Sequence, residues 1–247
     1  MNVPRLTMWI CSLSLLGLAV ESWAQGRSVN GKTFTENPSF THPSVGRTLG
    51  QAHRDSAAAR KASKGPVVMS FDTLPASPWQ AWNCLDGGTA TVSNGILAID
   101  SPTCYEFDLW NPAGEWNQYV NNEEGWVIEA RLKLDPITVP SSNQDRGAVL
   151  IWANDHVNLL IIGFQPNELR LAYPDYVPVA MNTTDDFHTY RIQSRLNTVQ
   201  IYVDGVLRID HVLSWSGGGS DLLTFGDGDG QGHSLSYWDY FMYDVTP

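Results

Sequence analysis

The sequence predicts an all-β fold, an antiparallel β-sandwich or jelly roll, on the basis of three observations. Between Val67 and Pro247 many short segments alternate apolar with polar residues, which is the pattern of strands that bury one face. Turn-forming residues separate these segments about every eight to twelve residues. No segment shows a helical period longer than two turns. Together these features are typical of a two-sheet sandwich.

Two segments show how the strands are recognised. Residues 89–99, TATVSNGILAI, form two short runs around Asn94-Gly95, a dipeptide that favours the type I′ turn of a hairpin. Residues 127–134, VIEARLKL, place apolar side chains on one face and charged side chains on the other: Ile128, Ala130, Leu132 and Leu134 against Glu129, Arg131 and Lys133.

The later strands follow the same pattern. Three apolar runs, separated by NDHV and QPN, predict consecutive strands: AVLIWA, NLLIIGF and ELRLAY. Two further alternating segments, FHTYRI and VQIYV, precede Asp204-Gly205 and the segment VLRI. The second and third of these pair as a hairpin across the Asp-Gly turn.

Residues 1–24 are predicted to form a signal peptide. Arg5 precedes the apolar run LTMWICSLSLLGLAV, which is too short to span a bilayer, and small residues at Ser22 and Ala24 precede the expected cut. An uncleaved N-terminal anchor is the alternative. No later segment is apolar enough to span a membrane, so we expect an exported protein, secreted, on the cell surface or periplasmic, without membrane insertion after signal removal.

The charge distribution divides the rest of the chain into a leader, residues 25–66, and a domain, residues 67–247. The leader carries seven basic against two acidic residues and lacks apolar periodicity, so it reads as a disordered tether or pro-segment. The domain carries seven basic against 23 acidic residues. This acidic balance argues against nucleic acid as a partner, because phosphates require a basic surface.

Two cysteines, Cys84 and Cys104, remain after signal removal. In an exported protein, two cysteines 20 residues apart favour a disulfide over a metal site, because zinc needs about four ligands and no histidine has suitable spacing. Closing this loop would contribute ~3 kcal/mol. Two free thiols are the alternative.

Four segments resemble, in the correct order, those of the concanavalin A-like lectins and glucanases. They are VMSFDTLP with VSNGILAI near the front, FHTYRI…VQIYVDGVLRIDH, the lead-in LTFGDGDGQGHS, which resembles a turn of the laminin-G-like members, and the closing strand SYWDYFMYDV. The resemblance covers most of the domain. It implies a concanavalin A-like jelly roll and says much less about function.

The same resemblance supplies a test for enzymatic activity. Family 16 glucanases share the FHTY…YVDGV segment and carry paired acids on a strand some forty residues upstream, because retaining hydrolysis needs two carboxyl groups about 5 Å apart. The corresponding region, GAVLIWANDHVNLLIIGF, contains a single acid, Asp155, in a predicted turn. Glu123-Glu124 and Asp185-Asp186 are adjacent pairs and read as solvated turns. We therefore expect no catalytic site.

The aromatic content favours binding of a glycan. The segment YEFDLWNPAGEWNQYVNNEEGW reads as an irregular region in which rings alternate with amides and acids, a mixture suited to a neutral sugar. The candidate carbohydrate-binding residues are Trp110, Trp116, Tyr119, Trp152 and His156. The alternative for the tryptophans is the sandwich core, and for His156 an exposed turn.

The resemblance also implies one structural Ca²⁺. Its ligands would be Asp239 of the closing strand, Gly95 of the first hairpin and a residue near Asp72, since calcium takes hard oxygen ligands. The alternative is that Asp239 only hydrogen-bonds nearby groups.

The sequence therefore predicts an exported lectin-like domain that binds an extracellular or cell-surface glycan or polysaccharide without cleaving it. An extracellular glycoside hydrolase or lyase with non-standard catalytic residues is the first alternative. A structural or adhesive surface protein is the second.

Overall fold

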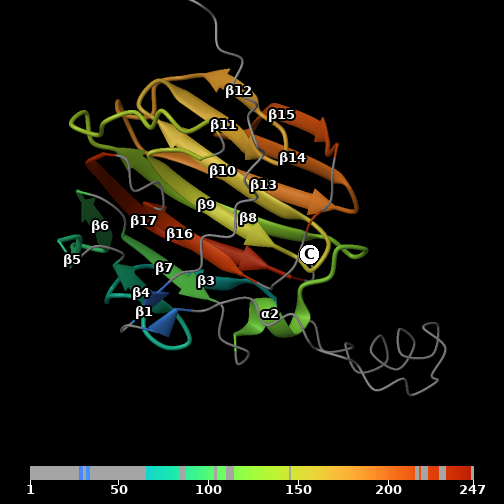
Figure 1. Cartoon of the computed structure of the whole chain (residues 1–247), viewed down its shortest axis with the longest axis horizontal. Helices are drawn as coiled ribbons and strands as arrows, with labels where there is room; N and C mark the ends of the chain where they lie inside the picture. Colours follow the sequence, from blue (N-terminus) through green and yellow to red (C-terminus); the bar gives the residue numbers. More distant parts are fainter. Residues whose placement is uncertain are drawn as a thin grey trace, which may run out of the picture. The chain divides into compact units, whose positions relative to one another are not determined.

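The computed structural model describes residues 28–29, 32–33, 65–83, 87–102, 105–109, 114–144, 146–214, 217, 222–227 and 232–245. Residues 65–245 of this set form two antiparallel sheets packed face to face, with one short helix, α2 (Glu115–Tyr119) (Figure 1). Separately, β1 (Ser28–Val29) pairs with β2 (Lys32–Thr33) within the predicted leader. The predicted all-β sandwich is confirmed.

One layer is an eight-stranded sheet. Its strands follow the order β15-β14-β13-β8-β17-β6-β5, and β3 pairs with β17 off this path. The members are β3 (Val67–Met69), β5 (Thr89–Ser93), β6 (Ile96–Ser101), β8 (Trp126–Leu134), β13 (His188–Arg195), β14 (Thr198–Val203), β15 (Val206–Val212) and β17 (Ser234–Asp244). The last strand, β17, lies in the middle of this sheet and pairs with β8, β6 and β3.

The other layer is a seven-stranded sheet in the order β12-β11-β10-β9-β16-β7-β4. The members are β4 (Gln80–Asn83), β7 (Tyr105–Leu109), β9 (Val149–Asn154), β10 (Leu159–Gln165), β11 (Glu168–Tyr173), β12 (Val177–Ala180) and β16 (Leu223–Asp227). Strand β16, which follows β15 in the chain, lies between β9 and β7.

The core fills the space between the two sheets. Alternate residues of each strand point inward, as in Ile128, Ala130 and Leu132 of β8, which are all fully buried. Aromatic rings fill the space around Phe225 of β16, whose ring stacks on that of Phe241 with 4.6 Å between centroids. Offset ring stacking stabilises such a core beyond the burial of its area.

The predicted strands all form, and the first hairpin has the expected turn. Asn94 and Gly95 have φ values of 54° and 75°, as a type I′ turn requires. Six strands were not predicted. Two are β1 and β2 of the leader, three are β4, β7 and β12, and the sixth is β16, which sequence reasoning took for part of a turn. β12 contains Pro178, which lowers its strand signal, and it is tolerated because β12 is an edge strand.

The signature segment that begins FHTY has a structural role in this fold. Nδ1 of His188 lies 2.7 Å from a carboxylate oxygen of Asp204, and Nε2 lies 3.1 Å from a carboxylate oxygen of Asp185. Asp204 also accepts a hydrogen bond from the backbone N–H of Thr189. Burial lowers the pKa of His188, but its hydrogen bonds with both carboxylates outweigh burial and raise the pKa above the usual value. The histidine thus fixes the β14–β15 turn to β13.

Several predictions made from sequence lie outside the described residues. These are the signal peptide (residues 1–24), the leader except for β1, β2 and residues 65–66, the cysteines Cys84 and Cys104, and Trp110. Asn83, the last residue of β4, pairs with Tyr105, the first residue of β7, and these two residues directly adjoin the two cysteines in the sequence. Among the described residues, no helix has the length and hydropathy to cross a membrane.

Candidate functional site

The outer face of the seven-stranded sheet, the face turned away from the other sheet, is the candidate site. The strand register places side chains in rows across this face, because residues directly opposite each other share one side of a sheet. One row runs through Glu106, Gly226, Leu150, Gly163 and Arg170. The next row runs through Asp108, Thr224, Trp152 and Ile161.

An apolar patch occupies the middle of this face. Leu150, Ile161 and Ala172 form a small cluster separate from the main core, and Trp152 and Tyr173 pack against it. The two aromatic side chains are half-buried, whereas the three aliphatic ones are buried. The guanidinium carbon of Arg146 lies 5.7 Å from the centroid of the Trp152 ring, a cation–π distance.

Two carboxylates lie beside the patch on β7. Glu106 and Asp108 are separated by one residue on a strand and therefore project from the same face. Both are buried, with 3% and 4% of their surface exposed. Thr224 of the neighbouring strand donates a hydrogen bond from Oγ1 to Asp108 at 2.6 Å.

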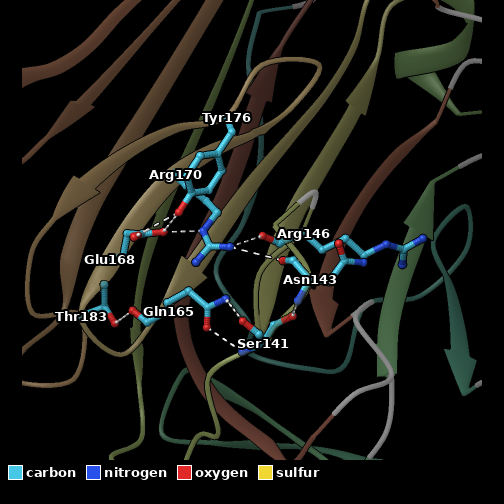
Figure 2. A network of polar contacts seen from close by, with 8 residues as sticks. All are labelled: Ser141, Asn143, Arg146, Gln165, Glu168, Arg170, Tyr176 and Thr183. Carbon is cyan, nitrogen blue, oxygen red and sulfur yellow. Dashed lines mark hydrogen bonds and ion pairs between the residues drawn. The ribbon is translucent and has the colours of Figure 1, made fainter. Parts of the chain in front are cut away.

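The loop before β9 is fixed to the side of the patch opposite Glu106 and Asp108 by the side chains drawn in Figure 2. Gln165 accepts from the N–H of Ser141 at 2.9 Å and donates to the carbonyl of the same residue at 3.3 Å. Arg170 donates from Nη1 to the carbonyl oxygens of Asn143 and Arg146, at 3.3 and 3.4 Å. These four bonds hold Ser141, Asn143 and Arg146 against β10 and β11.

Arg170 is the centre of this network. Its Nε lies 2.5 Å from Oε1 of Glu168, and its side chain is only 8% exposed. Tyr176 donates to Glu168 at 3.3 Å, and the centroid of its ring lies 5.3 Å from the guanidinium carbon of Arg170 (Figure 2). The glycine at position 163 allows the loop to come this close, because a Cβ there would lie 2.6 Å from the Arg146 carbonyl oxygen.

The predicted carbohydrate-binding residues that the structure describes lie in different environments. Trp152 lies at the centre of the apolar patch. Trp116 is fully buried, donates its indole N–H to the carbonyl of Asn154 at 2.8 Å and packs edge-on against Trp126. Its prediction as a sugar-binding residue is therefore wrong, since it fills the core as the alternative held. Tyr119 is half-buried on α2, and Trp110 lies outside the described residues.

His156 is exposed in the turn between β9 and β10 with a φ of 71°. The adjacent Asp155 is 1% exposed and organises that turn. It accepts from the indole N–H of Trp126 at 2.7 Å and from the backbone N–H of Asn158 at 2.7 Å. Asp155 is therefore a structural carboxylate, and Glu123 and Glu124 are exposed as predicted.

The predicted metal ligands come from adjoining segments. Asp239 lies at a bulge of β17 between Trp238, which pairs with Leu97 of β6, and Phe241, which pairs with Met69 of β3. Oδ2 of Asp239 lies 2.5 Å from Nη1 of Arg131. No cluster of three His, Cys, Asp or Glu side chains that could hold a metal occurs in the described part of the chain. A cation here would depend on backbone carbonyls and would compete with Arg131.

Sequence reasoning missed Glu106 and Asp108, although a signal was present. In YEFDL the acids alternate with Phe107 and Leu109, which is the strand pattern. The aromatic residues around this segment favoured an irregular region instead. The structure shows that its apolar residues are core and its acids line the outer face.

Comparisons with known proteins give fold-level similarity only. No family model matches the sequence, and no curated protein matches it. Solved structures with a similar fold include a Bacillus licheniformis β-glucanase, with 14% identity, 73% of this chain and 98% of that chain covered and a TM-score of 0.47. The catalytic domain of a Thermotoga petrophila endo-1,3-β-glucanase (laminarinase) shows 16% identity, 72% and 96% coverage and a TM-score of 0.47.

The carbohydrate recognition domain of Emp47p shows 11% identity, 71% and 91% coverage and a TM-score of 0.45. The neighbours are concanavalin A-like glucanases and lectin-like domains, in agreement with the distant resemblance drawn from the sequence. At these TM-scores, the function has to be argued from the residues of the chain itself.

Proposed function

We propose that this chain binds a glycan, without cleaving it, on the outer face of the seven-stranded sheet. The observation that carries the proposal is the apolar patch around Trp152 and Tyr173, which has two carboxylates on one side and two arginines on the other. The carboxylates are Glu106 and Asp108, and the arginines are Arg146 and Arg170.

The chemistry of a sugar matches this arrangement. A pyranose ring presents apolar C–H groups on its faces, which pack on an aromatic ring, and hydroxyl groups on its edges. Binding sites for such ligands are largely apolar with a few well-placed polar groups that fix orientation. Hydrogen bonds to ionised carboxylates and guanidinium groups are stronger than neutral ones, so the flanking side chains supply orientation and specificity.

A second candidate function is hydrolysis of a glycosidic bond by Glu106 and Asp108. The observation that favours it is their position on one face of one strand beside the patch. Alternate residues of a strand lie about 7 Å apart, within the range of roughly 6.5–9.5 Å that inverting glycosidases use. Hydrolysis needs both acids for the reaction, and Asp108 is engaged by Thr224, so binding is the preferred proposal.

A glycan array combined with an assay of reducing-end release tests both functions. We expect binding without release, and we expect Trp152→Ala to weaken binding at this site by about 2 kcal/mol, roughly 30-fold in Kd. Val212→Ala, an exposed side chain on β15 of the other sheet, is the control and should bind as the wild type does. Release of reducing ends that is lost in Glu106→Gln would establish hydrolysis, and the absence of both signals would contradict each function.

The proposed setting is outside the cytoplasm. An export signal in residues 1–24, a disulfide between Cys84 and Cys104 and an acidic domain are mutually consistent with an exported protein whose partner is a cell-surface or extracellular glycan. A mature N-terminus near residue 25, found by sequencing the protein recovered from an export-competent host, tests this part of the proposal.

A further inference from the structure

The outer face of the eight-stranded sheet, on the opposite side of the sandwich, carries a hollow of its own. One part, of about 380 Å³, is lined by Glu129, Thr189, Arg191, Gln193, Tyr202 and Gly205. A second part, of about 320 Å³, is lined by residues that include Arg191, Gln193, Arg195 and Gln200. The two parts adjoin along β13, where they share Arg191 and Gln193, and together they are called the groove.

The strand register explains why polar side chains gather here. Arg191 lies between Glu129 of β8 and Tyr202 of β14, and Gln193 lies directly opposite Gln200. Their neighbours Tyr190, Ile192 and Ser194 point into the sandwich and are buried. The groove is therefore lined by the outward set of three adjacent strands.

Most of these side chains are held in place by one another. Glu129 accepts from Arg191 at 3.2 Å and from the hydroxyl of Tyr240 at 2.8 Å. Tyr202 donates to Gln200 at 3.1 Å, and Gln200 donates in turn to Asp210 at 3.3 Å. Planar groups fixed in this way are pre-organised, so a ligand loses less free energy in ordering them.

Charged side chains of both signs line the groove in equal number, Glu124 and Glu129 against Arg191 and Arg195. Glu129 faces Arg191, and next to the groove Asp239 faces Arg131. Gln193, in the middle of the groove, forms no hydrogen bond with its side chain in the described part of the chain and is half-buried. A lining of amides, a phenol and paired charges suits a ligand rich in hydroxyl groups and without net charge.

We propose that this groove is a second glycan site, for a neutral sugar chain. The backbones beneath it are fully used in sheet pairing between β8, β13 and β14, so the groove offers no strand edge to an extended peptide. With one site on each outer face, a single molecule bridges two polysaccharide chains, and binding to a long polymer gains from multivalency. The bridging of two chains rests on the proposed function, because that function supplies the first site, around Trp152. The groove itself is argued independently of it.

The test measures stoichiometry by titration calorimetry with neutral hexasaccharides of glucose, mannose, galactose and xylose. For the hexasaccharide that binds best, we expect two molecules per chain for the wild type and one for Trp152→Ala. The double variant Gln193→Ala/Tyr202→Ala should also bind one. The wild type should precipitate the corresponding polysaccharide, and neither of these variants should do so.

Thr91→Ala serves as the matched control, because Thr91 is exposed on the same outer face, on β5, away from the groove. It should keep both sites. If removal of the Tyr202 ring impairs folding, Gln193→Ala alone, whose side chain points outward, should still lower affinity at the groove at least tenfold.

The outcomes separate the two proposals. Loss of all binding in Trp152→Ala, or unchanged stoichiometry in the groove variants, overturns the second site. Loss of all binding in the groove variants with unchanged binding in Trp152→Ala overturns the first site and supports the second. A groove that binds oligogalacturonate more tightly than every neutral probe overturns the assignment of a neutral ligand, and absence of binding to any probe overturns both sites.

Discussion

Replacement of Arg170 by methionine should destabilise the domain by about 3 kcal/mol. The substitution removes an ion pair with Glu168 and two hydrogen bonds to the carbonyl oxygens of Asn143 and Arg146. Loss of one partner of a buried pair costs about 3–5 kcal/mol, and the low end applies because Glu168 is 26% exposed. Methionine of similar length keeps the aliphatic packing, so the loss reports the polar contacts.

Thermal unfolding followed by circular dichroism measures this change. For a domain of this size, we expect a decrease in Tm of roughly 6–12 °C. Arg208→Met is the matched control, because Arg208 is exposed and its one hydrogen bond to the described part of the chain is long, 3.5 Å to the Ala180 carbonyl. Its effect should stay within about 0.5 kcal/mol.

The same variant should weaken glycan binding, since the loop that carries Arg146 over Trp152 loses its support. Arg170→Lys should behave like the methionine variant in binding, because an ammonium cannot contact Glu168 and two loop carbonyls at once as the guanidinium does. Equal melting temperatures for Arg170→Met and Arg208→Met would refute the role of the network. Lower stability with unchanged glycan affinity would show that the loop does not belong to the binding site.

Three further predictions concern other groups. Because the pKa of His188 is raised on folding, its pairs with Asp204 and Asp185 stabilise the fold fully below the unfolded pKa of about 6.5, and this stability is lost as the pH rises through the folded pKa. Urea unfolding at pH 6 and pH 8.5 should show this loss in the wild type and not in His188→Gln. Asp155→Ala leaves buried donors such as the Trp126 indole without an acceptor and should cost about 3–5 kcal/mol in urea unfolding; a cost below 1 kcal/mol would contradict its structural role. Calcium at about 100 times its Kd should raise the Tm by roughly 5–10 °C in the wild type and not in Asp239→Asn. An unchanged wild-type Tm would contradict a calcium site, and the ion pair with Arg131 would then be the role of Asp239.

The fold followed from the sequence because alternation and turn residues are local signals. Asn94-Gly95 sets a hairpin through its own backbone preferences, and Ile128 to Leu134 show which face of a strand is buried. The signal was weaker where a strand is buried on both faces. All of β16 is buried, so no polar alternation marks it, and its glycine and aspartate resemble a turn.

The candidate site was only partly predictable, because it depends on which strands become neighbours. Trp152 and Glu106 are brought to one face by β16, which comes from more than seventy residues later in the chain than Trp152 and is inserted between β9 and β7. No local pattern reports that insertion. Trp116 was assigned to the site for a related reason, since an indole next to polar residues in the sequence can still be buried by distant strands.

The central places of β16 and β17 have a consequence for biogenesis. Each of the two sheets lacks an inner strand until the segment between Leu223 and Asp244 has been synthesised, so a shorter nascent chain has two half-sheets with open edges and an uncovered core. Both sheets are therefore completed only when synthesis of the domain is nearly finished. Until then each half-sheet presents an unpaired strand edge to which another chain can pair.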